Sequence, residues 1–523
     1  MFEVSVMTEF ELKFEVSPVN LKVVVAAMQQ GMVTRQCLQA SYFDTDDRAL
    51  QKCGIVVRLR KEGRQWVQTA KASTADVLER LEHNAAVSKP SVGILLAPDL
   101  SRHRGTAVGK AIDEALAIKA HHSYPELHLV YGTDIQRTTA EVIFNGSVIE
   151  IALDQGWVFA GNGLQANSAE LSHPVCELEF ELKHGLAVDA VELARQWCAS
   201  HGLWISTITK SMKAQRLGGH ELCENTSGGM STQPMYSRHA TGHDMVTAVV
   251  AACLKQILPN MSELASGSKD ADHIHQLRVG IRRLRVALSE LRGFAQTDNP
   301  ENNTEPDWAA WEKALVTAFR ALGAHRDHSN LALVMQPKML AAGGPAMRTS
   351  ALQSKLVDLG DVVRKPAFQD ALLGLLGLVY AAGDQPNKPN GLQKMVSRHL
   401  AKLHRQALHH GPGFLELNEE QQHEVRKKLK RLRYLIEFSA PLFAARKVDK
   451  KLRGITTALK PAQDALGLYN DEVMALHAWR ALAGDDPNAW FGVGWLTARR
   501  QANARRCQKA INALAKIKPF WCK

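Results

Sequence analysis

The segment EFELKFE at residues 9–15 alternates charged and apolar side chains, with Glu9, Glu11 and Lys13 at every second position. Successive side chains of a β-strand point to opposite faces, so this alternation predicts a strand with one charged face and one apolar face. The segment CELEFEL at residues 176–182 repeats the pattern. Its acidic positions are Glu177, Glu179 and Glu181. Two predicted strands therefore each present a row of carboxylates on one side.

Glu150 and Asp154 share one face of a further strand, and clustered carboxylates stay ionised together only when cations compensate them. Basic residues near other predicted strands supply this opposite charge. If the strands close into a barrel with the charged faces inward, its lumen holds carboxylates on one side and Arg and Lys on the other, and no apolar ligand suits it. The candidate cations are Arg58, Arg60, Lys71, Arg137 and Lys210.

The remaining pattern of the first 217 residues is a mixture of short strands and a few helices. The period-two segments lie at residues 10–16, 54–61, 65–71, 138–144, 147–153 and 175–182. Helices are expected at residues 17–31, 109–120 and 188–201, the first with Ser17 as cap, Pro18 at its first position and Gly31 as its end. Alternating Glu and Lys is also typical of a solvated sheet face, but the second acidic strand and the basic strands favour the interior arrangement.

A metal ion would explain the clustered carboxylates. Mg²⁺ and Mn²⁺ prefer oxygen ligands and are commonly held by a few carboxylates together with substrate phosphates. Triphosphate is the natural counterpart of the cations. One phosphate–cation contact at 4 Å contributes only about 4 kcal/mol at an effective dielectric constant near 20, before desolvation is subtracted. Several cations are therefore needed to hold it.

These motifs together resemble the CYTH, or triphosphate tunnel metalloenzyme, family. The resemblance rests on E-x-E-x-K at residues 9–13, RLR at 58–60, WVQTAK ending at Lys71, IEIALDQG at 149–156 and CELEFEL at 176–182. It spans about residues 7–217 and implies an eight-stranded antiparallel β-tunnel with flanking helices. Family members include inorganic triphosphatases, thiamine triphosphatase and class IV adenylate cyclases, so all three activities stay open.

The resemblance also implies roles for individual residues. Metal-assisted attack of water on a terminal phosphorus is the implied reaction, with Mg²⁺ or Mn²⁺ as cofactor. Glu82, in the charged segment RLEHNAAV, matches a further tunnel acid close to the substrate. The implied metal ligands are Glu9, Glu11, Asp154, Glu177, Glu179 and Glu181. The implied phosphate ligands are Lys13, Arg58, Arg60, Lys71, Arg137 and Lys210. The implied catalytic residues are Glu9, Glu11, Lys13 and Lys71.

Charge divides the chain into two unlike halves. Residues 1–220 hold 22 Lys and Arg against 25 Asp and Glu, whereas the rest holds 42 against 28, so the second half suits a polyanionic partner. A Gly-, Ser- and Thr-rich linker is expected at residues 218–237, between domains at 1–217 and 238–523. No membrane span and no export signal are predicted, and a cytoplasmic location is expected.

The second half is helical and repeats itself. The segment HQLRVGIRRLR at residues 275–285 returns as HEVRKKLKRLR at 423–433, a constant offset of 148 residues. On a helix each copy places cations on one arc and apolar residues on another. The first arc holds His275, Arg278, Arg282 and Arg285, and the second holds His423, Arg426, Lys430 and Arg433. Lys255 and Arg405 are candidate supporting cations on the preceding helices.

These repeats resemble the CHAD domain over about residues 238–518. The resemblance implies two pseudo-symmetric four-helix bundles, at about 238–385 and 386–518, and a surface that binds long-chain polyphosphate. The two arcs contain no aromatic residue for base stacking, which disfavours a specific nucleic acid. In combination, the chain resembles bacterial inorganic triphosphatases of the CYTH-CHAD type. A non-catalytic protein that binds polyphosphate or attaches to its granules stays open as the alternative.

Overall fold

The computed structural model describes most of the chain. The described residues are 8–29, 31–63, 65–74, 76, 78–88, 97–118, 123–161, 171–217, 229–294, 307–347, 356–381, 391–443 and 446–521. They form two compact units, Met1–Gly228 with Arg364–Ala381, and Gly229–Val363 with Ala382–Lys523. Each unit is described by itself below.

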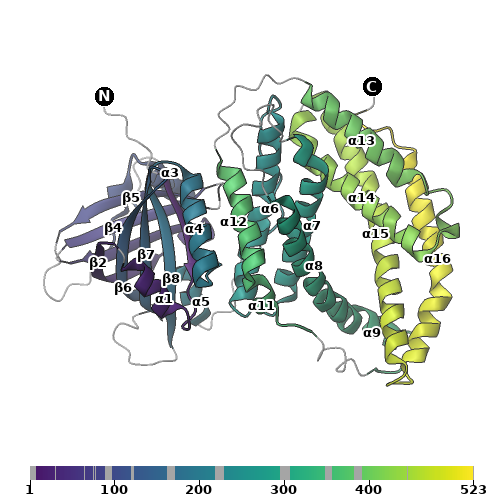
Figure 1. The fold of residues 1–523 in the computed structure, drawn as a ribbon, viewed down its shortest axis with the longest axis horizontal. Coiled ribbons are helices and arrows are strands. Elements are labelled where there is room, and N and C mark those ends of the chain that lie inside the picture. The colour runs from purple at the N-terminus through teal and green to yellow at the C-terminus, as the bar shows by residue number, and fades with distance from the viewer. Residues whose placement is uncertain are drawn as a thin grey trace. The chain divides into compact units, whose positions relative to one another are not determined.

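The first unit is a closed antiparallel β-barrel. Its strands follow one another in the order β5-β4-β3-β2-β6-β7-β8-β1, and a pairing between β5 and β1 closes the ring. The two-residue strand β9 (Trp204–Ile205) adds to β1. The eight-stranded tunnel expected from the sequence is therefore confirmed (Figure 1). The strands are β1 (Thr8–Glu15), β2 (Val33–Asp44), β3 (Ile55–Glu62), β4 (Gln65–Ser73), β5 (Glu79–Val87), β6 (His128–Phe144), β7 (Ser147–Ala160) and β8 (Ser172–His184).

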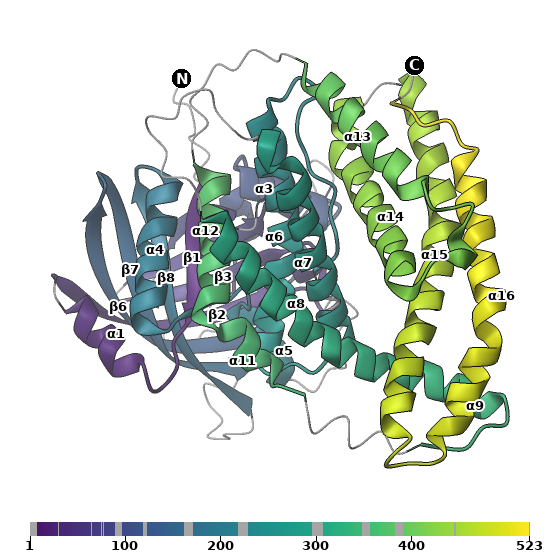
Figure 2. The ribbon, with the colours of Figure 1, turned by 45° about the vertical axis from the view of Figure 1, so that its right-hand side comes forward.

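The apolar faces of these strands lie on the outside of the barrel, under helices. Phe14 of β1 and Phe180 of β8 are fully buried and meet edge to face with 5.6 Å between ring centroids. Helix α4 (Ala187–His201) packs against β1 and β8, and α12 (Pro366–Tyr380) packs against α4 (Figures 1 and 2). Burial of apolar surface beneath these helices leaves the opposite, charged faces to line the interior.

Several elements differ from the sequence expectation. Strand β6 begins ten residues earlier than the period-two pattern indicated, and β2 joins β3 to β6 although its sequence alternates poorly. The first helix is only α1 (Leu21–Met28), because residues 18–20 form a turn in which the Ser17 hydroxyl accepts from the Asn20 amide. The second is α3 (Ala107–Ala115), which begins two residues earlier and ends sooner. Lys210 is the first residue of helix α5 (Lys210–Leu217) rather than a strand residue.

The second unit is all α-helical and contains the predicted repeat. The helix bounds of α7 and α14 differ by the same 148 residues at both ends. Helices α6, α7 and α8 pack in succession in the first repeat, α13 to α16 do so in the second, and α7 contacts α14. The helices are α6 (Gly242–Ala265), α7 (Ala271–Leu291), α8 (Trp308–Asn330), α9 (Gln336–Ala341), α11 (Leu359–Arg364), α13 (Leu392–Leu408), α14 (Glu419–Ser439), α15 (Arg446–Leu482) and α16 (Ala489–Ala515).

Helix α12 is the exception to the sequence division at residue 238. Its sequence lies within the helical half, but it packs on α4 and belongs to the barrel unit. Eight of its fifteen residues are buried there, among them Phe368 and Gln369. This helix has no wide polar face, so most of its surface is apolar and has to be covered by other elements.

Helix α6 is long and apolar enough to cross a membrane by length and composition, alone among the described helices. Its apolar window is 72% buried within the unit. A core helix of a helical bundle has the same composition, so this is weak evidence for a membrane span.

Gly156 in β7 is predicted to be essential for barrel closure. Its φ of +153° and its approach to β6 leave no room for a side chain, because a Cβ atom would overlap the carbonyl oxygen of Asp134. We expect Gly156→Ala to lower the free energy of unfolding by about 2 kcal/mol or more, measured by urea denaturation. Gly31→Ala is the control, since a Cβ there meets nothing within 4 Å. Equal effects of the two substitutions would contradict the prediction.

Candidate active site and basic cluster

The barrel encloses a cavity of about 870 Å³ with a highly charged wall. Adjacent strands place their charged residues opposite one another: Lys13 pairs in register with Glu179, and Lys71 with Glu82. The acidic residues of the wall are Glu9, Glu11, Glu82, Glu150, Glu179 and Glu181. The basic residues of the wall are Lys13, Arg58, Arg60, Lys71, Arg80, Arg137, Lys183 and Lys210. The structure describes every predicted site residue of the barrel. Of these, Asp154 and Glu177 do not line the cavity.

Glu9, Lys71 and Glu82 form one group of the wall. The Lys71 ammonium lies 2.5 Å from Glu9 Oε2 and 3.0 Å from Glu82 Oε2. Burial, with Glu11 and Glu82 nearby, raises the pKa of Glu9 to about 8 even though Lys71 opposes the shift. Burial also acts on Glu82, but Lys71 and hydrogen bonds from Glu9 and Asn84 outweigh it and lower its pKa to about 2. Both acids therefore compete for Lys71, and burial leaves the pKa of Glu9 above that of Glu82.

Glu11 lies between this group and the next. Burial raises its pKa, and Glu179 on the neighbouring strand β8 raises it further. Lys71, Arg80 and Lys210 act in the opposite direction. Burial and the neighbouring carboxylates thus raise the pKa of both Glu9 and Glu11, the condition under which a carboxylate gains most from a bound cation.

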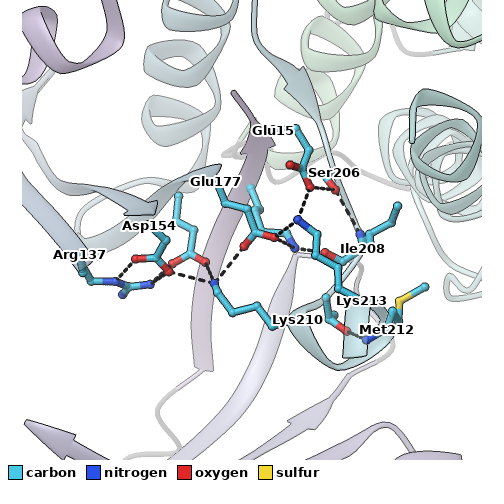
Figure 3. A network of polar contacts seen from close by, with 12 residues as sticks. Glu15, Arg137, Asp154, Glu177, Ser206, Ile208, Lys210, Met212 and Lys213 are labelled. Carbon is cyan, nitrogen blue, oxygen red and sulfur yellow. Dashed lines mark hydrogen bonds and ion pairs between the residues drawn. The ribbon is translucent and has the colours of Figure 1, made fainter. Parts of the chain in front are cut away.

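Arg137, Asp154 and Lys210 form the second group, drawn in Figure 3. The Arg137 guanidinium donates to both Asp154 oxygens, at 2.6 and 2.7 Å, and also to Glu179. Lys210 reaches Asp154 at 2.9 Å and Glu179 at 3.2 Å. Asp154 is 1% exposed, so its role in this structure is to orient Arg137 and Lys210 from behind the cavity wall.

Glu177 is the centre of a third group and is fully buried. Its oxygens lie 2.7 Å from Lys213, 2.9 Å from Lys210 and 3.5 Å from Lys13. Burial opposes its ionisation, but the three ammonium groups hold its pKa far below the usual range. Lys213 also reaches Glu15 at 2.8 Å (Figure 3). Glu177 thereby fixes the lysines of β1 and α5 in place.

The sequence interpretation missed some of these residues. Lys213 follows Lys210 by three positions, so once the segment is known to be helical both point to the same face. Tyr42 of β2 and Tyr131 of β6 also line the cavity, stacked with 4.2 Å between ring centroids. Neither tyrosine belongs to a charged alternation, and only the register of β2 on β6 places them side by side.

The two remaining phosphate-ligand candidates differ in their partners. Arg58 is half-buried, and its Nε has no hydrogen-bond partner among the described residues. Arg60 is held by Glu62, which contacts its Nε at 2.6 Å, and burial beside Arg58 lowers the pKa of Arg60. Both guanidinium groups line the cavity and present donors to it.

In the helical unit, cations of both repeats meet in one place. We call Arg278 and Arg282 of α7, Arg326 of α8, and Arg426 and Lys430 of α14 the basic cluster. Burial, together with the nearby Arg282 and Arg326, lowers the pKa of Arg278 and of Arg426 to about 10. Burial and the same two arginines, with Arg426, lower the pKa of Lys430 to about 6. Two residues of the first arc, Arg278 and Arg282, therefore lie close to Arg426 and Lys430 of the second.

Few acids compensate this cluster. Asp471 accepts a bidentate pair from Arg326 at 2.9 and 3.0 Å. Buried nitrogen atoms of Arg278 and Arg426 have no hydrogen-bond partner among the described residues. Phe319 of α8 lies beneath the arginines, 4.7 Å from the Arg278 guanidinium carbon and 5.4 Å from that of Arg282. The two arcs themselves contain no aromatic residue, so this support comes from a different helix, α8.

The other predicted cations of this unit lie around or beyond the cluster. His275 is an exposed residue beside Arg326, and His423 shares a hydrogen bond of 3.0 Å with Asn470. Burial lowers the pKa of both histidines. Arg285 contacts Phe319, exposed Arg433 donates to Gln463, Arg405 is exposed on α13 and Lys255 is partly buried on α6.

Comparison with known families matches both units. The CYTH domain family matches residues 7–214, and the CHAD domain family matches residues 248–480. The chain is a CYTH domain followed by a CHAD domain. The barrel with its charged cavity is thus the CYTH domain, and the basic cluster lies in the CHAD domain.

Three individual proteins are similar to parts of the chain. An inorganic triphosphatase of Haemophilus influenzae is 25% identical over 221 residues, which are 41% of this chain and 56% of that protein, so the match spans little more than half of the relative's length. The CHAD domain structure of the plant Ricinus communis is 22% identical, covers 55% of this chain and 96% of its own, and has a TM-score of 0.45. A Hippeastrum protein described as having a dominant triphosphatase activity is 13% identical, with coverages of 40% and 100% and a TM-score of 0.29.

CYTH enzymes are generally dependent on a divalent metal, and part of the acid set of this CYTH domain fits one. Within the described ranges, no three His, Cys, Asp or Glu side chains are already spaced around an ion position. Glu9 and Glu11 nonetheless offer oxygen donors on the cavity wall with raised pKa values, and Glu179 lines the same wall. A divalent cation would compensate this crowding in place of Lys71. Asp154 and Glu177 are engaged by Arg and Lys behind the wall.

Glu177 is predicted to stabilise the CYTH domain through its three lysines. Glu177→Gln leaves Lys13, Lys210 and Lys213 short of a buried counter-charge, so we expect the free energy of unfolding at pH 7 to fall by about 3–5 kcal/mol. Because the pKa of Glu177 is depressed, its contribution is present above the ordinary value of 4.5 and is lost as pH falls below it. The deficit of the variant, measured by denaturant titration, should therefore narrow at acid pH.

The control for this prediction is Glu192→Gln. Glu192 forms a surface ion pair with Arg195 at 3.5 Å, and such pairs contribute less than about 1 kcal/mol. A Glu177→Gln deficit no larger than that of Glu192→Gln would contradict the role assigned to Glu177.

Proposed function

We propose that the CYTH domain hydrolyses inorganic triphosphate to pyrophosphate and phosphate with the help of Mg²⁺ or Mn²⁺, and that the CHAD domain binds long-chain polyphosphate. The observation that carries the proposal is the cavity wall, where eight Arg and Lys side chains and six carboxylates surround about 870 Å³. A small, compact polyanion with bound divalent cations complements both signs of charge at once. The relationship to an inorganic triphosphatase supports the choice of substrate.

In this proposal the cations bind and orient the phosphate chain. Arg58 and Arg60 present guanidinium groups to the cavity, and Lys13, Arg137 and Lys210 present fixed charges held by the acids behind them. Fixed donors cost little reorganisation during the reaction, which is why charge stabilisation in a prearranged site lowers the barrier. Phosphoryl transfer needs positioning and charge neutralisation more than covalent help from the protein.

In this proposal Glu9 and Glu11 of β1 bind the metal ion and accept the proton that the attacking water loses. A bound divalent ion would neutralise phosphate charge and acidify a water molecule. Glu9 and Glu11, whose pKa values are raised by burial, lie on the cavity wall, where their carboxylates would hold this ion and accept the proton. Lys71 exchanges its contact with Glu9 for a phosphate oxygen when substrate enters, since both compete for the same ammonium.

The CHAD domain contributes a second, separate anion site. Some nitrogen atoms of Arg278 and Arg426 have no hydrogen-bond partner among the described residues. Together with the low pKa of Lys430, they indicate a cluster that gains stability when phosphates enter it. The excess of basic residues in the second half supports binding to polyphosphate in the cytoplasm and to its granules.

The two activities are predicted to separate by mutation. Glu9→Ala and Glu11→Ala should lower triphosphate hydrolysis by about a thousandfold or more, because metal ligands are removed, yet leave retention of long-chain polyphosphate intact. Arg278→Ala with Arg426→Ala should weaken that retention and its salt dependence while hydrolysis persists. Product analysis with triphosphate, ATP and thiamine triphosphate, together with a filter-binding assay, measures both.

Other outcomes of this experiment favour other functions. Faster turnover of thiamine triphosphate or conversion of ATP to a cyclic nucleotide would replace inorganic triphosphate as substrate. Binding without turnover of any of the three compounds would favour a non-catalytic polyphosphate-binding protein. Loss of both activities in Glu11→Ala, with the fold intact, would contradict the division between the domains.

Polyphosphate binding is predicted to take up a proton at Lys430. A polyanion raises the pKa of this ammonium from about 6, so the added affinity is fully present below pH 6 and is lost as pH rises through the higher pKa of the complex. Affinity should therefore fall by up to about tenfold per pH unit within that window, measured by fluorescence anisotropy between pH 6 and 8.5. Lys430→Arg, which stays charged, should flatten this dependence.

The control is Lys394→Arg on an exposed position of α13. This substitution should leave the pH dependence of the wild-type protein unchanged. His275 and His423 have lowered pKa values and supply whatever dependence Lys430→Arg retains. An identical pH profile in Lys430→Arg and wild type would refute proton uptake at Lys430.

A further inference from the structure

Helix α12 touches the barrel at two places, and both lead to strand β1. The chain reaches this helix only after residue 363, far from the rest of the barrel sequence. Strand β1 carries Glu9, Glu11 and Lys13 and so holds most of the implied catalytic residues. An element that fixes both ends of β1 fixes the positions of its acids.

The first contact lies at the C-terminal end of β1. Gln369, which is fully buried, accepts a hydrogen bond of 2.9 Å from the Ile205 amide through its side-chain oxygen. Ile205 belongs to β9 and pairs with Phe14 of β1. The next residue, Ser206, donates its amide to the Lys13 carbonyl at 2.8 Å. Gln369 therefore holds the short strand that closes the edge of β1 beside Lys13.

The second contact lies at the N-terminal end of β1. The Tyr380 hydroxyl donates to Asp76 Oδ1, and its ring meets Phe10 edge to face with 4.9 Å between centroids. Asp76 Oδ1 also accepts from the Leu78 amide at 2.8 Å, and the Leu78 carbonyl accepts from the Glu11 amide at 3.1 Å. One chain of hydrogen bonds thus runs from Tyr380 to the backbone of Glu11.

An ion pair fixes the helix between these contacts. Asp370 receives two hydrogen bonds from Arg195 of α4, at 2.6 and 3.2 Å. The apolar face of α12 packs on the same helix. The brace is therefore anchored to α4, and α4 itself packs on β1.

We propose that α12 is a brace for the metal-binding strand and that Tyr380 is a positioning residue for Glu9 and Glu11. Phe10, which Tyr380 contacts, lies between these two acids in β1. Carboxylates bind a metal well only when neighbours hold them within a fraction of an ångström of the productive geometry. The inference rests on the proposed function in one respect, namely that Glu9 and Glu11 bind the metal.

The test compares Tyr380→Phe with Tyr124→Phe in the full chain. Each substitution removes one phenolic hydroxyl that donates a hydrogen bond to an aspartate. The Tyr124 hydroxyl donates at 2.7 Å to Asp113, which belongs to α3 and lies away from β1. Mn²⁺ binding without substrate is measured by titration calorimetry, and thermal unfolding is measured in parallel. Triphosphate hydrolysis is then recorded over a range of Mg²⁺ concentrations.

We expect Tyr380→Phe to weaken Mn²⁺ binding by about three- to tenfold and to raise the Mg²⁺ concentration for half-maximal activity by the same factor. The kcat at saturating Mg²⁺ should stay within about twofold. Tyr124→Phe should change neither quantity. Gln369→Met, which keeps the size of the side chain and removes the acceptor at the other end of β1, serves as the second variant and should act in the same direction.

Three results overturn the inference. One is a lowered unfolding temperature in Tyr380→Phe with unchanged Mn²⁺ affinity, which makes α12 a stabilising element alone. Another is an equal loss of affinity in Tyr124→Phe, and the third is a wild-type protein that binds no Mn²⁺. If the wild type binds Mn²⁺ and Tyr380→Phe weakens it while triphosphate is not hydrolysed by either, the brace stands and the proposed reaction fails.

Discussion

Charge compensation inside a closed barrel is the constraint on which the CYTH domain depends. Strands whose interior faces carry carboxylates can close around a cavity only if cations lie on the neighbouring strands, and the register supplies them: Lys13 lies opposite Glu179, and Arg137 opposite Asp154. Because these charges are desolvated, an unpaired member would cost several kcal/mol. The same pairing that permits the fold thereby fixes the donors that face the substrate.

The interior does not treat all its acids alike. Glu177 and Asp154 are sequestered by Lys213, Lys210 and Arg137, and the low pKa of Glu177 follows from that. Glu9 and Glu11 face the cavity with raised pKa values instead. One set of acids thus holds lysines and arginines in place behind the wall, and the other lines the cavity, where Glu9 contacts Lys71.

The CHAD domain concentrates basic side chains, with few acids to neutralise them. Its cations gather from two repeats, but Asp471 is engaged by Arg326 and buried nitrogen atoms of Arg278 and Arg426 lack partners among the described residues. Phe319 supports the guanidinium groups without neutralising them. Buried cations that few acids neutralise are costly, and the polyanion proposed above would compensate several of them at once.

The sequence by itself determined the local elements and the identity of most charged residues on the cavity wall. Period-two alternation is a local property of a strand, so E-x-E-x-K and CELEFEL showed which side chains share a face, and the 148-residue repeat located α7 and α14. Only the tertiary structure decided which acids reach the cavity, because Lys213 of α5 covers Glu177 and the pairing of β6 with β7 sets Arg137 against Asp154. It also decided that α12 packs on the barrel and that Phe319 lies under the arginines. Such contacts depend on burial of whole helix faces, which a local pattern does not specify.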